Sequence, residues 1–98
     1  MNEILEHIVF TAALEACTHE ELDWIERIKD QLRENLRIGD VLQFYWFREK
    51  RFKGRRVYFI INEYTNKALL VAISGKKGQQ KIIDFIVKHR EEYFQYLR

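Results

Sequence analysis

The sequence contains no proline, a single cysteine and no long apolar run, and the last two features each exclude a class of protein. One cysteine, Cys17, can build neither an internal disulfide framework nor a cysteine-rich zinc site. No stretch approaches the roughly 20 apolar residues of a membrane span. The first ten residues carry acids where a signal peptide carries bases. We therefore expect a cytoplasmic protein with a buried, inert thiol and no membrane segment.

Residues that would mark a metal or a conventional catalytic centre are also scarce. The three histidines, His7, His19 and His89, are dispersed and have no carboxylate at ligand spacing. The one serine, Ser74, is interpreted as a strand-end or cap residue. No complete phosphate-binding loop motif is present, since the Gly-Lys-Lys-Gly at 75–78 is far shorter. The sequence predicts neither a metal nor a cofactor.

What the sequence has is enough apolar and aromatic mass for one small domain. Its 98 residues are 47% hydrophobic and include 7 Phe, 5 Tyr and 2 Trp. Large aromatic side chains let a short chain bury a sizeable core. No linker, repeat or low-complexity stretch interrupts it, so residues 1–98 are expected to form a single domain.

Two segments have the apolar spacing of amphipathic helices. Thr18 and Glu21 form a capping box before an apolar repeat, which predicts a helix over 19–36 that ends before Gly39. A second amphipathic pattern predicts a helix over 79–97. Residues 3–16 fit either a helix or a short strand in HIVFT followed by a helical turn, and the pattern leaves both open.

Between the helices the composition becomes that of strands. Residues 41–48, 56–62 and 67–74 are rich in β-branched and aromatic side chains and are separated by short turns. Short connections predict an antiparallel meander, with 41–48 as a central strand because both of its faces are large. The expected fold class is therefore α+β, a three- to four-stranded antiparallel sheet with the two helices packed on one face.

Charge is distributed unevenly along the chain. Residues 1–47 hold ten acids and four bases, whereas residues 48–98 hold thirteen bases and five acids. The segment 48–56 has six bases and one acid, which suits either a solvated hairpin tip or contacts with phosphates. We predict a nucleic-acid-binding surface on these bases. The aromatic residues of 41–48 are for the most part better interpreted as core filling on both faces, and base stacking by those on a partly exposed face is the alternative. The expected contacts come from five bases: Arg51, Lys53, Arg55, Lys76 and Lys81.

The predicted meander brings distant bases together. The end of its first strand and the start of its second are adjacent, and the end of its third strand lies beside them. Arg48, Arg56 and the segment 74–77 are therefore expected at one end of the sheet. Such a cationic cluster binds a phosphodiester and can stabilise charge that develops on it.

The residues in this region resemble the catalytic half of RelE/HigB-type toxins. In that superfamily a basic strand leads through a Gly-containing turn to a strand that begins with arginine, and a later apolar strand ends in bases. The matching pieces here are Gly54, then Arg56-Val57-Tyr58-Phe59, then 69–74 followed by Gly75-Lys76-Lys77. KKGQQKIIDFI resembles the start of the last helix in HigB-like members, and HIVFTAALEA resembles the first strand and helix.

The resemblance implies a ribonuclease that cuts mRNA, often on the ribosome, and a cognate antitoxin that blocks it. It places Arg56 and Lys77, with Lys76, at the scissile phosphate, and gives Arg48 or Lys50 a part in proton transfer to or from the ribose 2′-OH. Where several members carry an aromatic residue or histidine beyond the closing base, this sequence has Gly78, Gln79 and Gln80. The alternatives are a nucleic-acid-binding domain without catalysis, and an interaction protein whose acidic helix 19–36 docks a partner.

Overall fold

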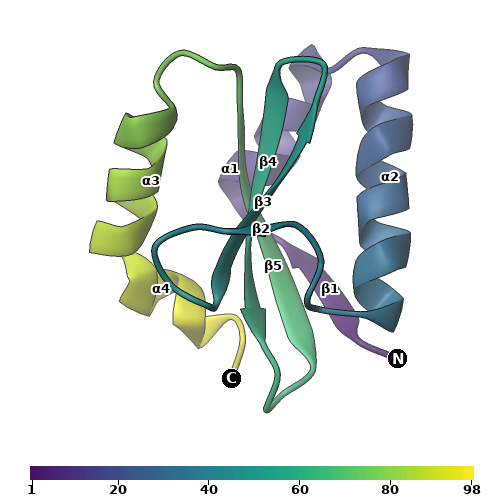
Figure 1. The fold of residues 1–98 in the computed structure, drawn as a ribbon. Helices are drawn as coiled ribbons and strands as arrows, with labels where there is room; N and C mark the ends of the chain where they lie inside the picture. Colours follow the sequence, from purple (N-terminus) through teal and green to yellow (C-terminus); the bar gives the residue numbers. More distant parts are fainter.

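The computed structural model describes residues 1–98 and begins with a strand followed at once by a helix (Figure 1). Strand β1 spans Glu3–Glu6, helix α1 spans Ile8–Ala13 and a 3₁₀ turn η1 spans Leu14–Ala16. Both expected kinds of element are present, but the strand precedes HIVFT, which is itself mostly helical. His7 explains the boundary, because its Nδ1 accepts a hydrogen bond from the backbone N–H of Val9 and caps α1.

The acidic helix α2 spans His19–Glu34, close to its predicted bounds. The predicted capping box is confirmed: the Thr18 hydroxyl accepts from the N–H of Glu21, whose carboxylate accepts from the N–H of Thr18. Its buried stripe consists of Trp24, Ile25, Ile28 and Leu32.

The sheet has five strands in the order β1-β5-β4-β3-β2. The remaining strands are β2 (Asp40–Val41), β3 (Phe47–Phe52), β4 (Arg55–Asn62) and β5 (Lys67–Ser74). The predicted antiparallel meander is confirmed for β3, β4 and β5, while β1 pairs with β5 in parallel. The sheet thus has more strands than predicted, because β1 and the two-residue β2 cover its edges.

The prediction of one central strand over 41–48 is wrong. Residues 42–46 form a turn between β2 and β3, closed by the bond from the N–H of Phe47 to the carbonyl of Phe44. The aromatic residues here fill space at the end of the sheet, where Trp46 stacks on Phe44 and meets Phe94 edge-on. Aromatic composition alone does not distinguish that role from a strand. Strand β3 instead continues through the charged residues 48–52, and only Lys53 and Gly54, both with positive φ, form the hairpin turn.

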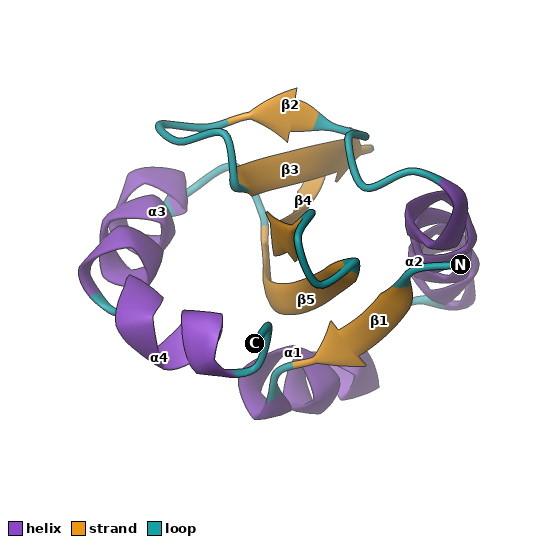
Figure 2. Cartoon of the chain, turned by 90° about the horizontal axis from the view of Figure 1, so that it is seen from below, coloured by secondary structure: helices purple, strands orange, loops and turns teal.

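The helices lie on both faces of the sheet rather than on one, which corrects the predicted arrangement (Figure 2). Helix α2 packs with α1 against Val57, Phe59 and Leu70. Helices α3 (Gln79–Lys88) and α4 (Arg90–Gln95) pack against the alternate side chains, among them Tyr58, Ile60 and Leu69. Strands β4 and β5 are apolar on both faces because each face has its own helical cover.

The predicted helix over 79–97 is divided into α3 and α4 at His89, whose φ of −103° and ψ of 19° leave the helical region. The break turns the chain so that Tyr93 and Leu97 can reach the same core as Ile83 and Ile86. No helix of this fold combines the length and the apolar character needed to span a membrane.

A β-bulge between β4 and β5 sets which side chains reach the α3 face. The register shifts at Tyr58 and Phe59, so that Tyr58 pairs with Ala72 and Phe59 with Leu70. One extra residue in β5 reverses the side-chain alternation beyond it. Ser74 therefore faces α3 beside Tyr58, instead of facing α2.

Candidate nucleic-acid interface

The basic residues gather where β3, β4 and β5 meet the start of α3. In the register, Arg51 lies opposite Arg56, and Arg56 lies opposite Ser74, so the three side chains stand abreast on the α3 face. Like charges directly opposite each other destabilise a strand pair. The sheet can therefore hold Arg51 and Arg56 side by side only with a compensating charge close by.

That charge is Glu49, the one acid of segment 48–56, and its side chain has no solvent exposure. Its Oε1 accepts from Arg51 Nε at 2.8 Å and from Arg56 Nη1 at 3.3 Å. Its Oε2 accepts from Gln79 Nε2 at 3.0 Å. The carboxylate bond raises the pKa of Arg51 further above its ordinary value, so this arginine stays charged. Glu49 therefore fixes two arginines and ties the first residue of α3 to the sheet.

Beneath these arginines is a buried hydroxyl pair. The Tyr58 hydroxyl and Ser74 Oγ are 2.9 Å apart, and Ser74 also donates to the carbonyl of Gly75. Burial raises the pKa of Tyr58, so the phenol remains protonated. Both residues are buried, and their hydrogen bonds fix the end of β5 and the start of the loop that follows it, next to the two arginines.

Lys76 and Lys77 lie in the loop that begins directly after Ser74. Both are exposed, and no acid lies within salt-bridge distance of either. The next residue, Gly78, has a φ of +79°, and no side chain caps the first turn of α3. The uncapped amides of a helix start carry partial positive charge, which adds to that of the two lysines.

The hairpin turn is less cationic than its sequence indicates. Lys53 Nζ lies 3.0 Å from a carboxylate oxygen of Glu20, and Arg55 Nε lies 3.1 Å from one of Glu21. Both acids belong to the first turn of α2. The acidic and basic halves of the chain therefore meet here, and part of the charge of segment 48–56 is neutralised within the molecule.

The predicted convergence of bases holds for Arg56 with the segment 74–77 and does not include Arg48. Arg48 points to the α2 face, where it is buried and donates to the carbonyls of Ile38 and Tyr45 at 2.8 and 3.1 Å. Lys50 lies on that face too, beside Asp30 and Glu34. In a strand, side chains two residues apart share a face, so Arg48 and Lys50 point away from Arg56.

Sequence reasoning missed the three polar residues that organise the site: Glu49, Tyr58 and Gln79. The signal for Glu49 was present as a lone acid among six bases. The sequence pattern places Tyr58 in an apolar strand and Gln79 at the start of a helix. Their connection to one another depends on the register and on the bulge, which no local pattern reveals.

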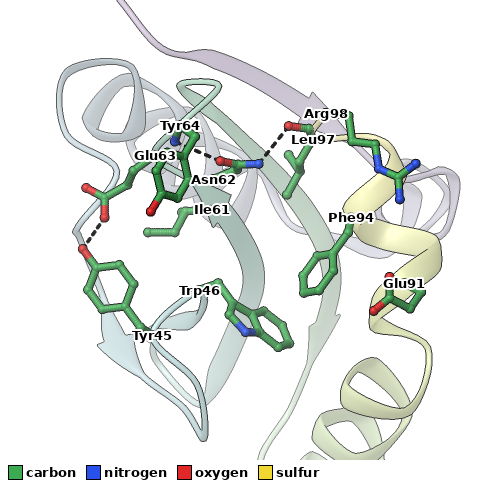
Figure 3. Close-up of a pocket in the computed structure, with 10 residues that line it drawn as sticks. All are labelled: Tyr45, Trp46, Ile61, Asn62, Glu63, Tyr64, Glu91, Phe94, Leu97 and Arg98. Carbon is green, nitrogen blue, oxygen red and sulfur yellow. Dashed lines mark hydrogen bonds between the residues drawn. The ribbon is translucent and has the colours of Figure 1, made fainter.

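The aromatic residues before β3 do not belong to this cluster. Tyr45 and Trp46 line a separate cavity of about 440 Å³ with Phe94 and the β4–β5 turn, at the opposite end of β4 from Arg56 (Figure 3). Glu63 at its rim bonds to the Tyr45 hydroxyl and to Arg37, and these bonds lower the pKa of Glu63. The aromatic residues, for which base stacking was the alternative to core filling, and the phosphate-binding bases thus lie in two separate places.

The basic cluster offers guanidinium and ammonium groups but no accessible histidine or carboxylate. Arg51, Arg56, Lys76 and Lys77 can hold a phosphate and offset negative charge on it. Arginine does not give up its proton in proteins, so only the lysines among them can transfer one. No group of three or more His, Cys, Asp or Glu side chains is placed to hold a metal ion.

The fold is that of the RelE toxins. An arginine-to-alanine double mutant of E. coli toxin RelE, solved in complex with a peptide of the antitoxin RelB, superposes with a TM-score of 0.68. The match covers 83% of this chain and 93% of that chain, with 6% sequence identity. No protein-family model matches the sequence, and no curated protein sequence is similar to it. The likeness therefore lies in the arrangement of helices and strands.

Proposed function

We propose that this protein is a RelE-like toxin, an endoribonuclease that cleaves mRNA in the cytoplasm and is held inactive by a cognate antitoxin. The observation that carries the proposal is that Arg51, Arg56 and Ser74 stand side by side at one end of a RelE-like sheet, where the loop with Lys76 and Lys77 leaves β5. A RelE toxin of the same fold was solved with an antitoxin peptide, which supports an antitoxin as partner.

In the proposed reaction the ribose 2′-OH loses its proton and attacks the adjacent phosphate, and the bond between phosphorus and the 5′ oxygen breaks. The 5′ oxygen leaves as a 5′-OH after gaining a proton, and the other product is a 2′,3′-cyclic phosphate. Arg56 and Arg51 stabilise the charge on the phosphate oxygens, from positions that Glu49 fixes. Lys77, with Lys76, contacts the phosphate from the loop and is the group available for proton transfer. Arg48 and Lys50 are left outside the proposed site because they lie on the opposite face of the sheet.

A second candidate function is RNA binding without cleavage. It is favoured by the pairing of Arg56 with a buried carboxylate, which leaves this arginine less charge to offer a transition state. It is also favoured by Gly78, Gln79 and Gln80, since these positions supply no acid or base. Both candidates predict RNA affinity that falls steeply with salt.

The test is induced expression in a bacterial host, followed by growth and by mapping of mRNA ends. Wild-type protein should arrest growth and generate new mRNA ends, and Lys77→Ala should relieve both. Arg98→Ala is the matched control, because it removes one exposed charge far from the cluster. Growth arrest without new mRNA ends, or relief by Arg98→Ala as complete as by Lys77→Ala, would contradict the ribonuclease assignment.

A further inference from the structure

Most of the lysines and arginines without an acidic partner lie on α3 or directly beside it. Of 17 lysines and arginines, nine have no acid within salt-bridge distance. Five of these nine fall between residues 76 and 90, on α3 and its two flanks: Lys76, Lys77, Lys81, Lys88 and Arg90. The bases of segment 48–56, which the sequence favours as the main contact, are mostly paired with acids.

The charged side of α3 is its outward side. Ile83 and Ile86 are buried against the sheet, whereas Lys81, Phe85 and Lys88 are exposed. Residues at spacings of four and seven lie on one face of a helix, so these three side chains form one stripe. Asp84 is the one acid on this helix, and it accepts a hydrogen bond from Gln80.

Phe85 gives the stripe an aromatic face. It is 56% exposed, which is unusual for a phenylalanine, and its ring lies 4.2 Å from that of His89. Exposed rings between cations are the arrangement with which proteins bind single-stranded nucleic acid, because bases stack on the rings while phosphates meet the charges. An acidic peptide would use the lysines but gain little from this aromatic pair.

The stripe continues from the proposed site. Gln79, the first residue of α3, bonds to Glu49, which bonds to Arg56. From Lys81 to Lys88 the helix rises about 10 Å, which is about three phosphates at the axial spacing of a stacked strand. The acidic helix α2 lies on the other side of the sheet, so a polyanion is drawn to the α3 side (Figure 2).

From this arrangement we infer that the outward face of α3 is an extended contact for single-stranded RNA, which holds the substrate beyond the phosphate bound at Arg56 and Lys77. Lys81 and Lys88 contact backbone phosphates, and Phe85 stacks on a base. The inference rests on the proposed function and adds to it the direction in which the RNA leaves the cluster.

The test compares binding of uncleavable 2′-O-methyl oligouridines of about four and about twelve nucleotides, lengths within the range of single-strand sites. Lys81→Ala/Lys88→Ala should lower the salt slope for the longer oligonucleotide by about 1.4, since each single-strand phosphate contact contributes about 0.7. The short oligonucleotide should bind as before. Phe85→Ala should weaken the longer oligonucleotide about fivefold with no change of slope.

The matched control is Arg27→Ala/Arg98→Ala, which removes two exposed charges that have no acid partner and lie away from α3. An equal loss of slope in this control would show that net charge alone matters, and would overturn the inference. Unchanged binding of the longer oligonucleotide by the α3 variants would overturn it while leaving the proposed site intact. Failure of wild-type protein to bind either oligonucleotide would overturn both. Loss of poly-glutamate binding without loss of RNA binding would assign the stripe to an acidic protein instead.

Discussion

Replacing Glu49 by alanine is expected to be the most destabilising single change within the basic cluster. The side chain is fully buried and accepts hydrogen bonds from Arg51, Arg56 and Gln79. Removing one partner of a buried ion pair costs about 3–5 kcal/mol. Arg51 is 59% exposed and can rehydrate, so about 2–3 kcal/mol is expected here. For a domain of this size that loss lowers the thermal midpoint by roughly 10–20 °C.

Thermal melts of three variants test the reasoning. Glu49→Gln keeps the shape and one acceptor oxygen and should lose about half as much as Glu49→Ala. Glu34→Ala, which removes an exposed carboxylate from α2, should change the midpoint little. A double-mutant cycle with Arg56→Ala should give a coupling of about 1–2 kcal/mol, because the second change removes a partner already lost. Additive effects of Glu49→Ala and Arg56→Ala would refute the proposed organisation of the cluster.

Three further predictions test other parts of the fold. Gly39→Ala should lower the free energy of unfolding by well over 1 kcal/mol, because Gly39 has a φ of +78° and a Cβ there would collide with the β3 backbone. Gly54→Ala, at a φ of +80° but with open space around it, should lower it by only about 1 kcal/mol. Equal thermal midpoints for the two variants would contradict this. Arg48→Met should lower stability by about 2–3 kcal/mol through the lost bonds to buried carbonyls, yet leave RNA affinity unchanged in binding measured well below its midpoint. The lowered pKa of Glu63, due first to its bond from Tyr45, means that this carboxylate adds stability above its ordinary value of 4.5, and that the stability is lost as the pH falls through the lower folded pKa. Glu63→Gln should therefore melt with less pH dependence in this acid range than wild-type protein, and identical pH profiles would contradict the assignment.

Local patterns predicted those elements whose signals are local. The capping box located the start of α2, and the short turns with alternating composition located β4 and β5. The prediction of a single strand over 41–48 was wrong because a turn whose aromatic side chains close the end of a sheet has the same composition as a strand. The placement of helices on both faces follows from β4 and β5 being apolar on both sides, and that evidence was present in their sequences.

The candidate site was predictable only in part, for reasons of register. A meander of any reasonable length places Arg56 and the end of β5 at one end of the sheet, whereas the direct pairing of Arg56 with Ser74 depends on the bulge. The orientation of Arg48 cannot be predicted in this way, because a shift of one residue along β3 turns each of its side chains to the other face of the sheet. The neutralisation of Lys53 and Arg55 by α2 depends on how this helix, distant in sequence, lies against the hairpin. The spacing of residues in the sequence does not predict that placement. Counting charges along the sequence therefore overestimates the unpaired positive charge of the hairpin and underestimates that of α3.

The measurement that tests the central claim most directly is cleavage of mRNA by purified protein, on and off the ribosome, by wild-type and Lys77→Ala proteins. Lys77 is exposed and unpaired, so its loss should leave the thermal midpoint within about 2 °C of wild type. Removal of one positioned charge from the phosphate should slow cleavage by about 10²–10³. Wild-type protein that cleaves neither substrate, or Lys77→Ala protein that cleaves at the wild-type rate, would contradict the account.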